Sequence, residues 1–338
     1  MSPIRIGILG AGRQGRLHCK NIVNHIPEAQ VVAISDPVKE NLDDINIHGV
    51  QCYTDCDKIF EDREIDAVII ASSTSSHEEM IEKACSTNKH IFCEKPIASD
   101  MEGIERSLKR IKESQIKFMI GFNRRFDPSN KKVSDLVQQG VIGQPQILCI
   151  TSRDPDPPSL EYLKNSGGFF FDTSIHDFDM ARYVMHDEII EIHALANSLV
   201  SEEIRGIGDV DTTMISLKFK SGALGCINNS RKAVYGYDQR IEVFGSKGSL
   251  STLNKPETQV SLLDEHGVHM DRNLYFYKER YPESFVEEIL AFINTIKQDT
   301  EPPATAKDAE IAVLLAKAAK DSYEQKKPIQ LEYTLISK

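Results

Sequence analysis

The sequence lacks the features that would mark several common classes of protein. Its seven cysteines are scattered and odd in number, and none forms a CxxC pair, so we expect reduced thiols and no metal site. No apolar run approaches the length of about 18 residues that a membrane span needs. The N-terminus "MSPIRIGILGAG" has no basic stretch before a long apolar segment, which predicts no secretory signal and a cytoplasmic protein.

An excess of basic residues is also missing. The chain has 51 acidic and 40 basic residues and a formal net charge of -11, which makes nucleic acid an unfavourable partner. The acidic residues are spread along the chain, and we find no internal repeat and no low-complexity segment. With 338 residues, 40% of them hydrophobic, the chain is long enough for about two globular domains.

The first part of the chain alternates short apolar runs with amphipathic helical stretches. The runs occupy residues 4–9, 30–35, 50–53, 66–71, 89–93 and 117–121. Strands separated by helices predict a parallel sheet with helices on both faces, which is the doubly wound Rossmann arrangement. We assign this domain to residues 1–122.

The pattern changes near residues 138–146, where glycine and proline interrupt it. Longer alternating runs follow at 189–200, 211–222, 223–234 and 238–253, with no helix between them. They predict a meander of antiparallel strands with one face covered. Helical segments follow at 283–298 and 305–325. We assign residues 123–338 to a second domain, a large, mostly antiparallel sheet flanked by helices. The C-terminal helix of this domain could pack back on the first domain.

A glycine-rich turn directly follows the first strand. Gly10, Gly12 and Gly15 form G-x-G-x-x-G, in which the glycines allow a tight turn, close approach to a pyrophosphate and close helix packing. Asp36 follows the second strand, where a carboxylate accepts both ribose hydroxyls of NAD and repels the 2′-phosphate of NADP. We therefore interpret this turn as an NAD-binding site; the alternative is a glycine-rich turn that binds no ligand.

"FCEKPIA" places an acid, a base and a proline at the end of the fifth strand. Ligands of open α/β sheets bind at the carboxyl ends of the strands, so Lys95 is expected near the nicotinamide. A lysine that is partly removed from water can exchange its proton. The alternative is a surface ion pair at a strand end.

"GGFFFDTSIHDFDMARYV" concentrates acids around one histidine. Asp172, His176 and Asp179 have the spacing of one helix face, whereas Asp177 falls off it. Three explanations compete: a metal site, a solvated helix end with Asp172 as N-cap, and a proton relay. One straight helix cannot wrap these three residues around an ion, and a helix end gives His176 no role.

Together, "GILGAGRQG", "VVAISDP", "FCEKPIA", "GFNRRFDP" and "GGFFFDTSIHDFD" resemble the Gfo/Idh/MocA oxidoreductase family over essentially the whole chain, and within it the inositol 2-dehydrogenases. The resemblance implies a Rossmann domain, a second domain built on a large sheet, and sheet-to-sheet packing into dimers or tetramers. Lys95, Asp172 and His176 match the family's catalytic triad. Glu94 would lie by the nicotinamide ribose, and the peptide before Pro96 is often cis in relatives.

The resemblance also extends the set of site residues. We expect the cofactor to contact Gly10, Gly12, Arg13, Gln14, Gly15, Asp36, Ser73, Thr74, His77, Glu94 and Lys95. Ser73, Thr74 and His77 carry less weight, because "ASSTSSHEEM" lacks the proline that many relatives have there. The substrate is expected at Asn123, Arg124, Asp154, Asp172, His176 and one of two tyrosines, Tyr235 or Tyr237.

These residues favour the proton relay. Oxidising a secondary alcohol needs a base for the hydroxyl proton, and a histidine ordinarily titrates near neutral pH. We expect His176 to take the proton, Asp172 to orient His176 or bind a neighbouring hydroxyl, and Lys95 to hold the alcohol oxygen. Many hydrogen-bonding groups suit a cyclic polyol, with myo-inositol going to its 2-keto form. Alternatives are another sugar or inositol isomer, a non-catalytic NAD-fold sensor and an NAD-dependent glycosidase.

Overall fold

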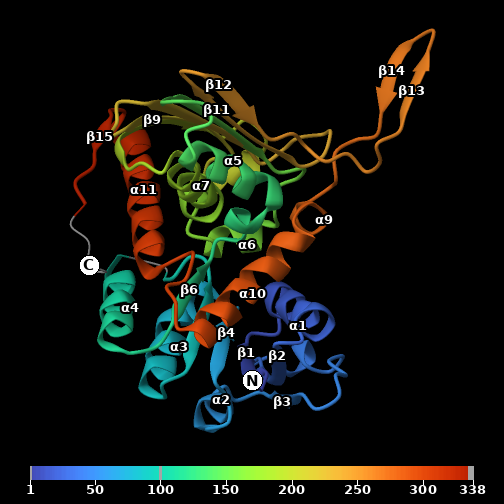
Figure 1. The fold of residues 1–338 in the computed structure, drawn as a ribbon, viewed down its shortest axis with the longest axis vertical. Coiled ribbons are helices and arrows are strands. Elements are labelled where there is room, and N and C mark those ends of the chain that lie inside the picture. Colours follow the sequence, from blue (N-terminus) through green and yellow to red (C-terminus); the bar gives the residue numbers. More distant parts are fainter. Residues whose placement is uncertain (1, 99–100, 334–338) are drawn as a thin grey trace. The chain divides into compact units, whose positions relative to one another are not determined.

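The computed structural model describes residues 2–98 and 101–333, which form two compact units (Figure 1). The first unit contains Met1–Phe126 and Glu283–Ile311, and the second contains Asp127–Pro282 and Ala312–Tyr333. The predicted boundary at 122/123 differs from this division in two respects. The first unit continues to Phe126, and it takes back a long segment from the C-terminal part of the chain.

The returning segment belongs to the first unit because its apolar residues are buried there. Helix α10 (Pro282–Gln298) buries Phe285, Ile289 and Phe292, and the Phe292 ring centroid lies 5.9 Å from that of Phe92. The Ile120 amide donates a hydrogen bond to the Ala304 carbonyl at 3.1 Å. An amphipathic pattern predicts such a helix but does not say on which domain it packs.

The first unit contains a six-stranded parallel sheet, as predicted. Its order is β3-β2-β1-β4-β5-β6, with strands β1 (Ile4–Leu9), β2 (Ala29–Ser35), β3 (Gln51–Tyr53), β4 (Ala67–Ile70), β5 (His90–Glu94) and β6 (Phe118–Gly121). Strand order reverses between β1 and β4, and the carboxyl ends of strands at such a switch point are where α/β sheets bind ligands.

Helices alternate with these strands and cover them. They are α1 (Arg13–His25), α2 (Asp57–Glu61), α3 (Thr74–Ser86) and α4 (Met101–Glu113), with short 3-10 turns η1 (Lys39–Asn41) and η2 (Asn123–Phe126). The residues of β4 are all buried, as expected for a strand covered on both faces. The doubly wound prediction is therefore confirmed.

The second unit contains a seven-stranded mixed sheet of order β12-β11-β7-β10-β9-β8-β15. Its strands are β7 (Pro145–Arg153), β8 (Ile189–Asn197), β9 (Thr212–Phe219), β10 (Leu224–Ser230), β11 (Asp238–Gly245), β12 (Gly248–Ser251) and β15 (Ile329–Gln330). β7 and β10 run parallel, and the other neighbours run antiparallel. The mostly antiparallel sheet is confirmed.

The predicted meander is wrong at one place. β10 and β11 follow each other in the sequence, but β7 lies between them and pairs with both. β7 comes from the region where the repeating pattern breaks. Its long-range pairing is not encoded by any local turn signal, so periodicity alone could not place it.

Helices cover one face of this sheet: α5 (Pro128–Gln138), α7 (Ile175–Met185) and α11 (Ala306–Gln325) (Figure 1). Shorter helices are α6 (Leu160–Asn165), α8 (Glu202–Gly206) and α9 (Tyr277–Arg280), and a hairpin of β13 (Ser261–Asp264) and β14 (Gly267–Met270) extends from the unit. The other face presents apolar side chains that are 45% to 63% exposed, namely Ile147, Leu195, Met214, Leu224 and Phe244. Among the described residues, no helix is both long and apolar enough to cross a membrane.

Candidate active site

The glycine turn between β1 and α1 has the backbone geometry that its sequence predicts. Gly10 has φ +99°, and a Cβ there would lie 2.6 Å from the Ser72 amide nitrogen. A Cβ on Gly15 would lie 1.9 Å from the Gly10 carbonyl oxygen. Both positions therefore require glycine, the first for its conformation and the second for the close packing of α1 on the turn.

Gly12 is different, because the space beside it is open. A Cβ at Gly12 would meet no atom of the described residues within 4 Å. Gly12 also precedes the first residue of α1, Arg13, so the open space faces a helix N-terminus. Backbone amides and the helix dipole favour an anion there. The turn thus fits the pyrophosphate of a dinucleotide.

Asp36 closes the other side of this turn. Its Oδ2 accepts a hydrogen bond from the Ala11 amide at 2.8 Å, and its Oδ1 accepts from the Val38 amide at 2.9 Å and from Asn41 Nδ2 at 3.0 Å. A carboxylate has about four acceptor positions, so these bonds fix the side chain and still leave capacity for a ribose hydroxyl.

Glu94 is the last residue of β5 and is buried. Two side chains of α1 contact its carboxylate. His18 Nε2 lies 2.7 Å from Glu94 Oε1, and Gln14 Nε2 donates to the same oxygen at 3.4 Å. Lys95 follows, half-buried, and its peptide bond to Pro96 is cis. Sequence reasoning identified Glu94 and Lys95 but missed His18, which carries no local motif.

His77, predicted as a cofactor contact, is buried between two loops. One ring nitrogen lies 2.8 Å from the Pro96 carbonyl and the other 3.2 Å from the Ser72 carbonyl. Burial lowers the pKa of His77 below its ordinary value, against the opposing effect of these two carbonyls. His77 therefore lies between the β4–α3 and β5–α4 loops, and its neutral ring, which has one N–H, donates to one of the two carbonyls. Ser73 is exposed at the start of α3, next to Thr74.

In the second unit, Asp172 lies in a π-helical turn, and His176 lies in the α-helix that follows it. Two glycines with positive φ, Gly167 and Gly168, precede a π-helical turn η3 (Phe170–Ser174) that contains Asp172. His176 is the second residue of α7. The wider π turn changes the angular relation that an ideal α-helix would give, and such turns are frequent at functional sites.

Asp172 is held by two residues that sequence reasoning missed. Tyr162 donates its hydroxyl to Asp172 Oδ1 at 2.8 Å, and Arg231 Nη2 lies 3.3 Å from Asp172 Oδ2. Arg231 is 1% exposed, and its guanidinium lies 4.9 Å from the centroid of the Phe169 ring. A buried arginine stays charged and favours the ionised carboxylate.

Asn229 anchors the start of α7 to the sheet. Its side-chain oxygen accepts from Ser174 Oγ at 2.9 Å and Thr213 Oγ1 at 3.0 Å, and its nitrogen donates to Asp177 Oδ2 at 2.8 Å. Asp177 and Asp179 are both completely buried. Asp177, which the periodicity placed off the candidate face, thus fixes the helix that carries His176.

Two further predicted residues lie in the turn η2 of the first unit. Asn123 and Arg124 are buried, and Asn123 Nδ2 donates to Ser284 Oγ at 3.4 Å. The neighbouring Arg125, which we did not predict, forms an ion pair with Asp308 at 3.0 Å. Arg125 therefore ties the turn to the returning C-terminal segment.

Of the remaining predicted residues, Asp154 lies at the end of β7, and the two tyrosines lie just before β11. Asp154 follows β7, and its amide donates to the Ser230 carbonyl at 2.9 Å. Tyr235 donates its hydroxyl to Asp238 Oδ2 at 2.7 Å and accepts from Arg153 Nη1 at 3.0 Å. Tyr237 is buried, and its ring packs edge-on against those of Phe276 and Tyr281.

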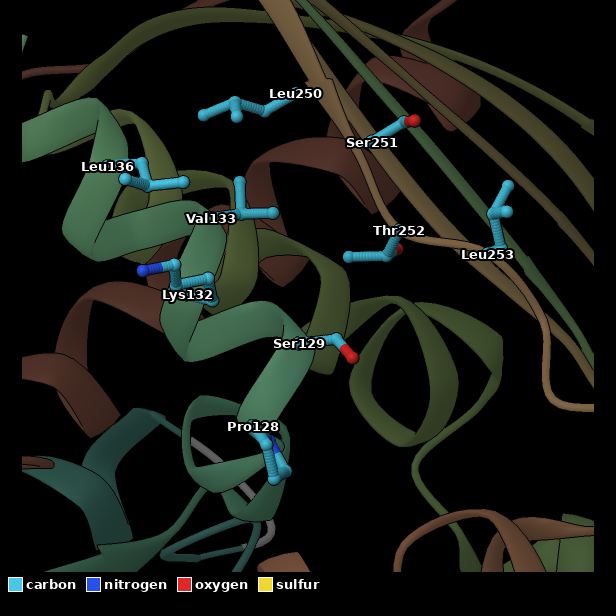
Figure 2. Close-up of a pocket in the computed structure, with 9 residues that line it drawn as sticks. All are labelled: Pro128, Ser129, Lys132, Val133, Leu136, Leu250, Ser251, Thr252 and Leu253. Atoms are coloured by element: carbon cyan, nitrogen blue, oxygen red, sulfur yellow. The ribbon is translucent and has the colours of Figure 1, made fainter. Parts of the chain in front are cut away.

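One open pocket of about 450 Å³ lies elsewhere in the second unit, between α5 and β12 (Figure 2). Its lining consists of Pro128, Ser129, Lys132, Val133, Leu136, Leu250, Ser251, Thr252 and Leu253. It contains none of the residues expected to bind cofactor or substrate, so we assign it no role in the candidate site.

Comparison with known proteins agrees with this geometry. Residues 4–122 match the Gfo/Idh/MocA oxidoreductase family model with an NAD-binding Rossmann fold, and residues 130–251 match the family's C-terminal domain model. The chain is 46% identical to the myo-inositol 2-dehydrogenase of Thermotoga maritima over 97% of this chain and 99% of that one.

Solved structures show the same fold. A putative myo-inositol dehydrogenase from Sinorhizobium meliloti is 38% identical with a TM-score of 0.94, over 97% of this chain and 100% of that one. The scyllo-inositol dehydrogenase of Lactobacillus casei, solved with bound NAD(H) and scyllo-inositol, is 31% identical with a TM-score of 0.90, over 97% and 99%. With a glycine turn and an Asp36 that fit NAD, this chain belongs to the Gfo/Idh/MocA family of NAD-dependent oxidoreductases.

Proposed function

We propose that this protein oxidises a secondary hydroxyl of a cyclic polyol with NAD, and that its substrate is myo-inositol, which becomes the 2-keto form. Full-length similarity to the Thermotoga maritima myo-inositol 2-dehydrogenase supports the substrate. The observation that carries the chemistry is Asp172, held by Tyr162 and Arg231 one turn before His176.

Lys95, Asp172 and His176 are proposed to act on one substrate hydroxyl. His176 accepts the hydroxyl proton, because a neutral imidazole is a base suited to neutral pH. Asp172 stabilises the imidazolium that forms or binds a neighbouring hydroxyl, and Arg231 keeps this carboxylate ionised. Lys95 holds the alcohol oxygen through its ammonium group. NAD, when bound, supplies the acceptor for the hydride that leaves the same carbon.

The substrate is proposed to be a ring with several hydroxyls, bound by Asn123, Arg124, Asp154 and one of the two tyrosines. A site built from such groups rejects an analogue that lacks a hydroxyl, because its own polar groups would stay unpaired. A second candidate is scyllo-inositol, which is supported by the Lactobacillus casei enzyme solved with that ligand.

The protein is further proposed to work as a homo-oligomer, a dimer or a tetramer, in the cytoplasm. The uncovered face of the seven-stranded sheet supports the assembly, since Leu195, Met214 and Leu224 are more than half exposed on it. An apolar patch on a sheet face is typical of a surface that is buried by another chain.

The proposal is tested by following the absorbance of reduced nicotinamide with NAD or NADP and a panel of myo-inositol, scyllo-inositol, glucose and xylose. Turnover of myo-inositol with NAD is expected, with losses of at least about a hundredfold in Lys95→Ala and His176→Ala. Lys220→Ala and His266→Ala, which change exposed residues of the same types, are the matched controls.

Other outcomes redirect the proposal. Turnover of another polyol keeps the chemistry and replaces the substrate. NAD binding without turnover of any polyol contradicts the dehydrogenase and favours a sensor, whereas release of an aglycone without net reduced nicotinamide favours a glycosidase.

A further inference from the structure

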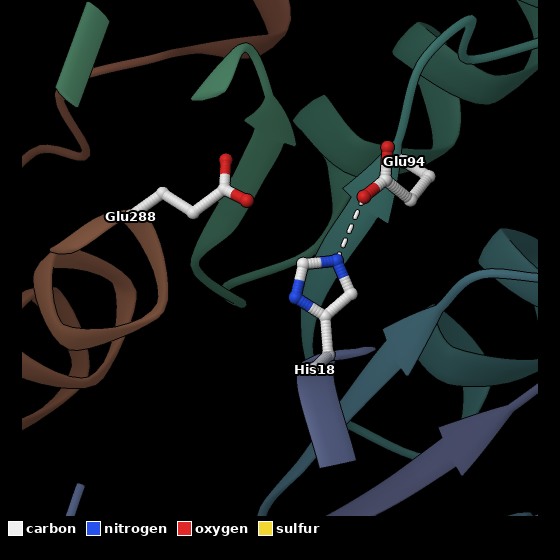
Figure 3. A group of neighbouring side chains, drawn as sticks. All are labelled: His18, Glu94 and Glu288. Atoms are coloured by element: carbon white, nitrogen blue, oxygen red, sulfur yellow. Dashed lines mark hydrogen bonds and ion pairs between the residues drawn. The ribbon is translucent and has the colours of Figure 1, made fainter. Parts of the chain in front are cut away.

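Three titratable side chains meet in the interior of the first unit (Figure 3). They are His18 from α1, Glu94 from the end of β5, and Glu288 from the returning helix α10. One ligand-type atom from each lies within 4.8 Å of the other two. His18 and Glu288 are both 0% exposed.

Glu288 is the unexplained member of this cluster. Within the described residues neither of its carboxylate oxygens has a hydrogen-bond partner. The groups that face it are His18 and Glu94, which are themselves paired at 2.7 Å. Burying an ionised carboxylate without a partner is very costly, and a second carboxylate nearby adds repulsion.

Aromatic rings pack against the His18 side of the cluster. The His18 ring packs edge-on against Phe92 and Phe285, with centroid distances of 5.3 Å and 6.2 Å. Burial, and then the Glu94 carboxylate, raise the pKa of Glu288 well above its usual range. Both the geometry and the electrostatics thus favour a neutral carboxyl.

A divalent cation fits the cluster less well than a proton. Two ligands on one tetrahedral ion lie about 3.4 Å apart when each bond is about 2.1 Å. His18 Nε2 and Glu94 Oε1 are separated by 2.7 Å, which is the distance of a hydrogen bond that shares a proton.

We propose that Glu288 is a positioning residue that holds a proton at neutral pH and presents a neutral, polar carboxyl to Glu94, so that the two carboxyls carry one negative charge. That charge stays on Glu94, in the orientation fixed by His18 and Gln14. Glu94 immediately precedes Lys95, and the role of Glu94 beside the nicotinamide ribose is the only part that rests on the proposed function. When Glu288 loses its proton, repulsion displaces Glu94 and NAD binds less tightly.

The test measures NAD binding without any polyol, so its result does not depend on which substrate is turned over. Glu288→Gln keeps the shape and the polarity but cannot ionise, and we expect its dissociation constant for NAD at neutral pH to stay within about twofold of wild type. Glu288→Met keeps the volume but loses the polar group that faces Glu94, and we expect affinity to fall about tenfold. A residue that only fills space would give equal effects in the two variants.

The pH dependence separates positioning from packing. Wild type is expected to lose NAD affinity as the pH is raised through the raised pKa of Glu288, and Glu288→Gln is expected to lack that loss. Parallel profiles for the two proteins would overturn the proposal.

A second measurement detects the protonated carboxyl directly in the wild-type protein, so it does not depend on whether a variant folds. Infrared spectroscopy of the wild-type protein is expected to show a protonated buried carboxyl at neutral pH that ionises when the pH is raised further. Its absence would overturn the proposal, as would a stoichiometric divalent metal in purified wild-type protein that is lost in Glu288→Gln.

Discussion

Arg231, the residue that follows β10, places Nη2 3.3 Å from Oδ2 of Asp172, which lies in the turn before α7. Arg231 is fully buried, and the exposed fraction of the Asp172 side chain is only 10%. The pair joins the end of a sheet strand to the helix that carries His176. Its two members are 59 residues apart in the sequence.

Arg231→Met is expected to impair both activity and folding. It leaves Asp172 without its buried counter-charge, and breaking such a pair costs about 3 kcal/mol of unfolding free energy. We expect kcat to fall at least about tenfold at saturating substrate. Steady-state kinetics and denaturant unfolding measure the two effects. Arg205→Met, at an exposed ion pair, is the control, and an unchanged kcat would contradict the role of Arg231.

Tyr162→Phe is expected to affect activity with little effect on folding. It removes one hydrogen bond to Asp172 Oδ1, and a bond to a charged acceptor is worth about 1.5 kcal/mol or more. We expect kcat to fall about tenfold while the thermal midpoint stays close to wild type, because Tyr162 is partly exposed. Tyr275→Phe, which loses a similar bond to the exposed Asp156, should retain full activity; equal losses would rule out a specific role.

The two glycines of the turn should respond to alanine in opposite ways. Gly15→Ala forces a Cβ onto the Gly10 carbonyl oxygen, so we expect a large loss of stability. Gly12→Ala has open space around its new methyl group, so the protein should fold normally but bind NAD at least about tenfold more weakly. Thermal unfolding and calorimetric titration with NAD distinguish the two. Normal NAD affinity in Gly12→Ala would show that NAD does not occupy the open space beside Gly12.

His77 should make the protein sensitive to mild acid. Burial lowers the pKa of His77 from its ordinary value of 6.5, so the unfolded chain binds a proton more readily than the folded one. Stability from this residue is therefore present above pH 6.5 and is lost as the pH falls through the lowered value, by at most about 1.4 kcal/mol per pH unit. Unfolding free energies of wild type and His77→Asn should converge as the pH falls; a constant difference would contradict this.

The parts of the molecule that sequence predicted well are those encoded by neighbouring residues. Gly10, Gly12 and Gly15 follow their strand directly. The alternation of short apolar runs with helical stretches predicts a doubly wound sheet without any information from the rest of the chain. Asp36 was found for the same reason, since it directly follows the second strand. The roles proposed for them in binding NAD rest on this local backbone geometry.

The parts that sequence could not predict depend on contacts between distant segments. Arg231 and Tyr162 carry no motif, and only the fold brings them to Asp172. β7 lies beside β10 and β11 through pairing that no turn specifies. Glu288 reads as one acid in an amphipathic helix, and a helix pattern does not reveal that this acid faces the interior.

The return of α10 to the first unit makes the cofactor-binding part of the chain discontinuous, with residues 127–282 acting as an insertion within it. During synthesis, the N-terminal strands and helices leave the ribosome long before Phe285, Ile289 and Phe292 are made. The nascent Rossmann segment therefore keeps part of its apolar surface uncovered until α10 has been translated. Cutting the chain after residue 126 would remove that cover permanently, so the cofactor unit is not a module that can be excised as one continuous piece.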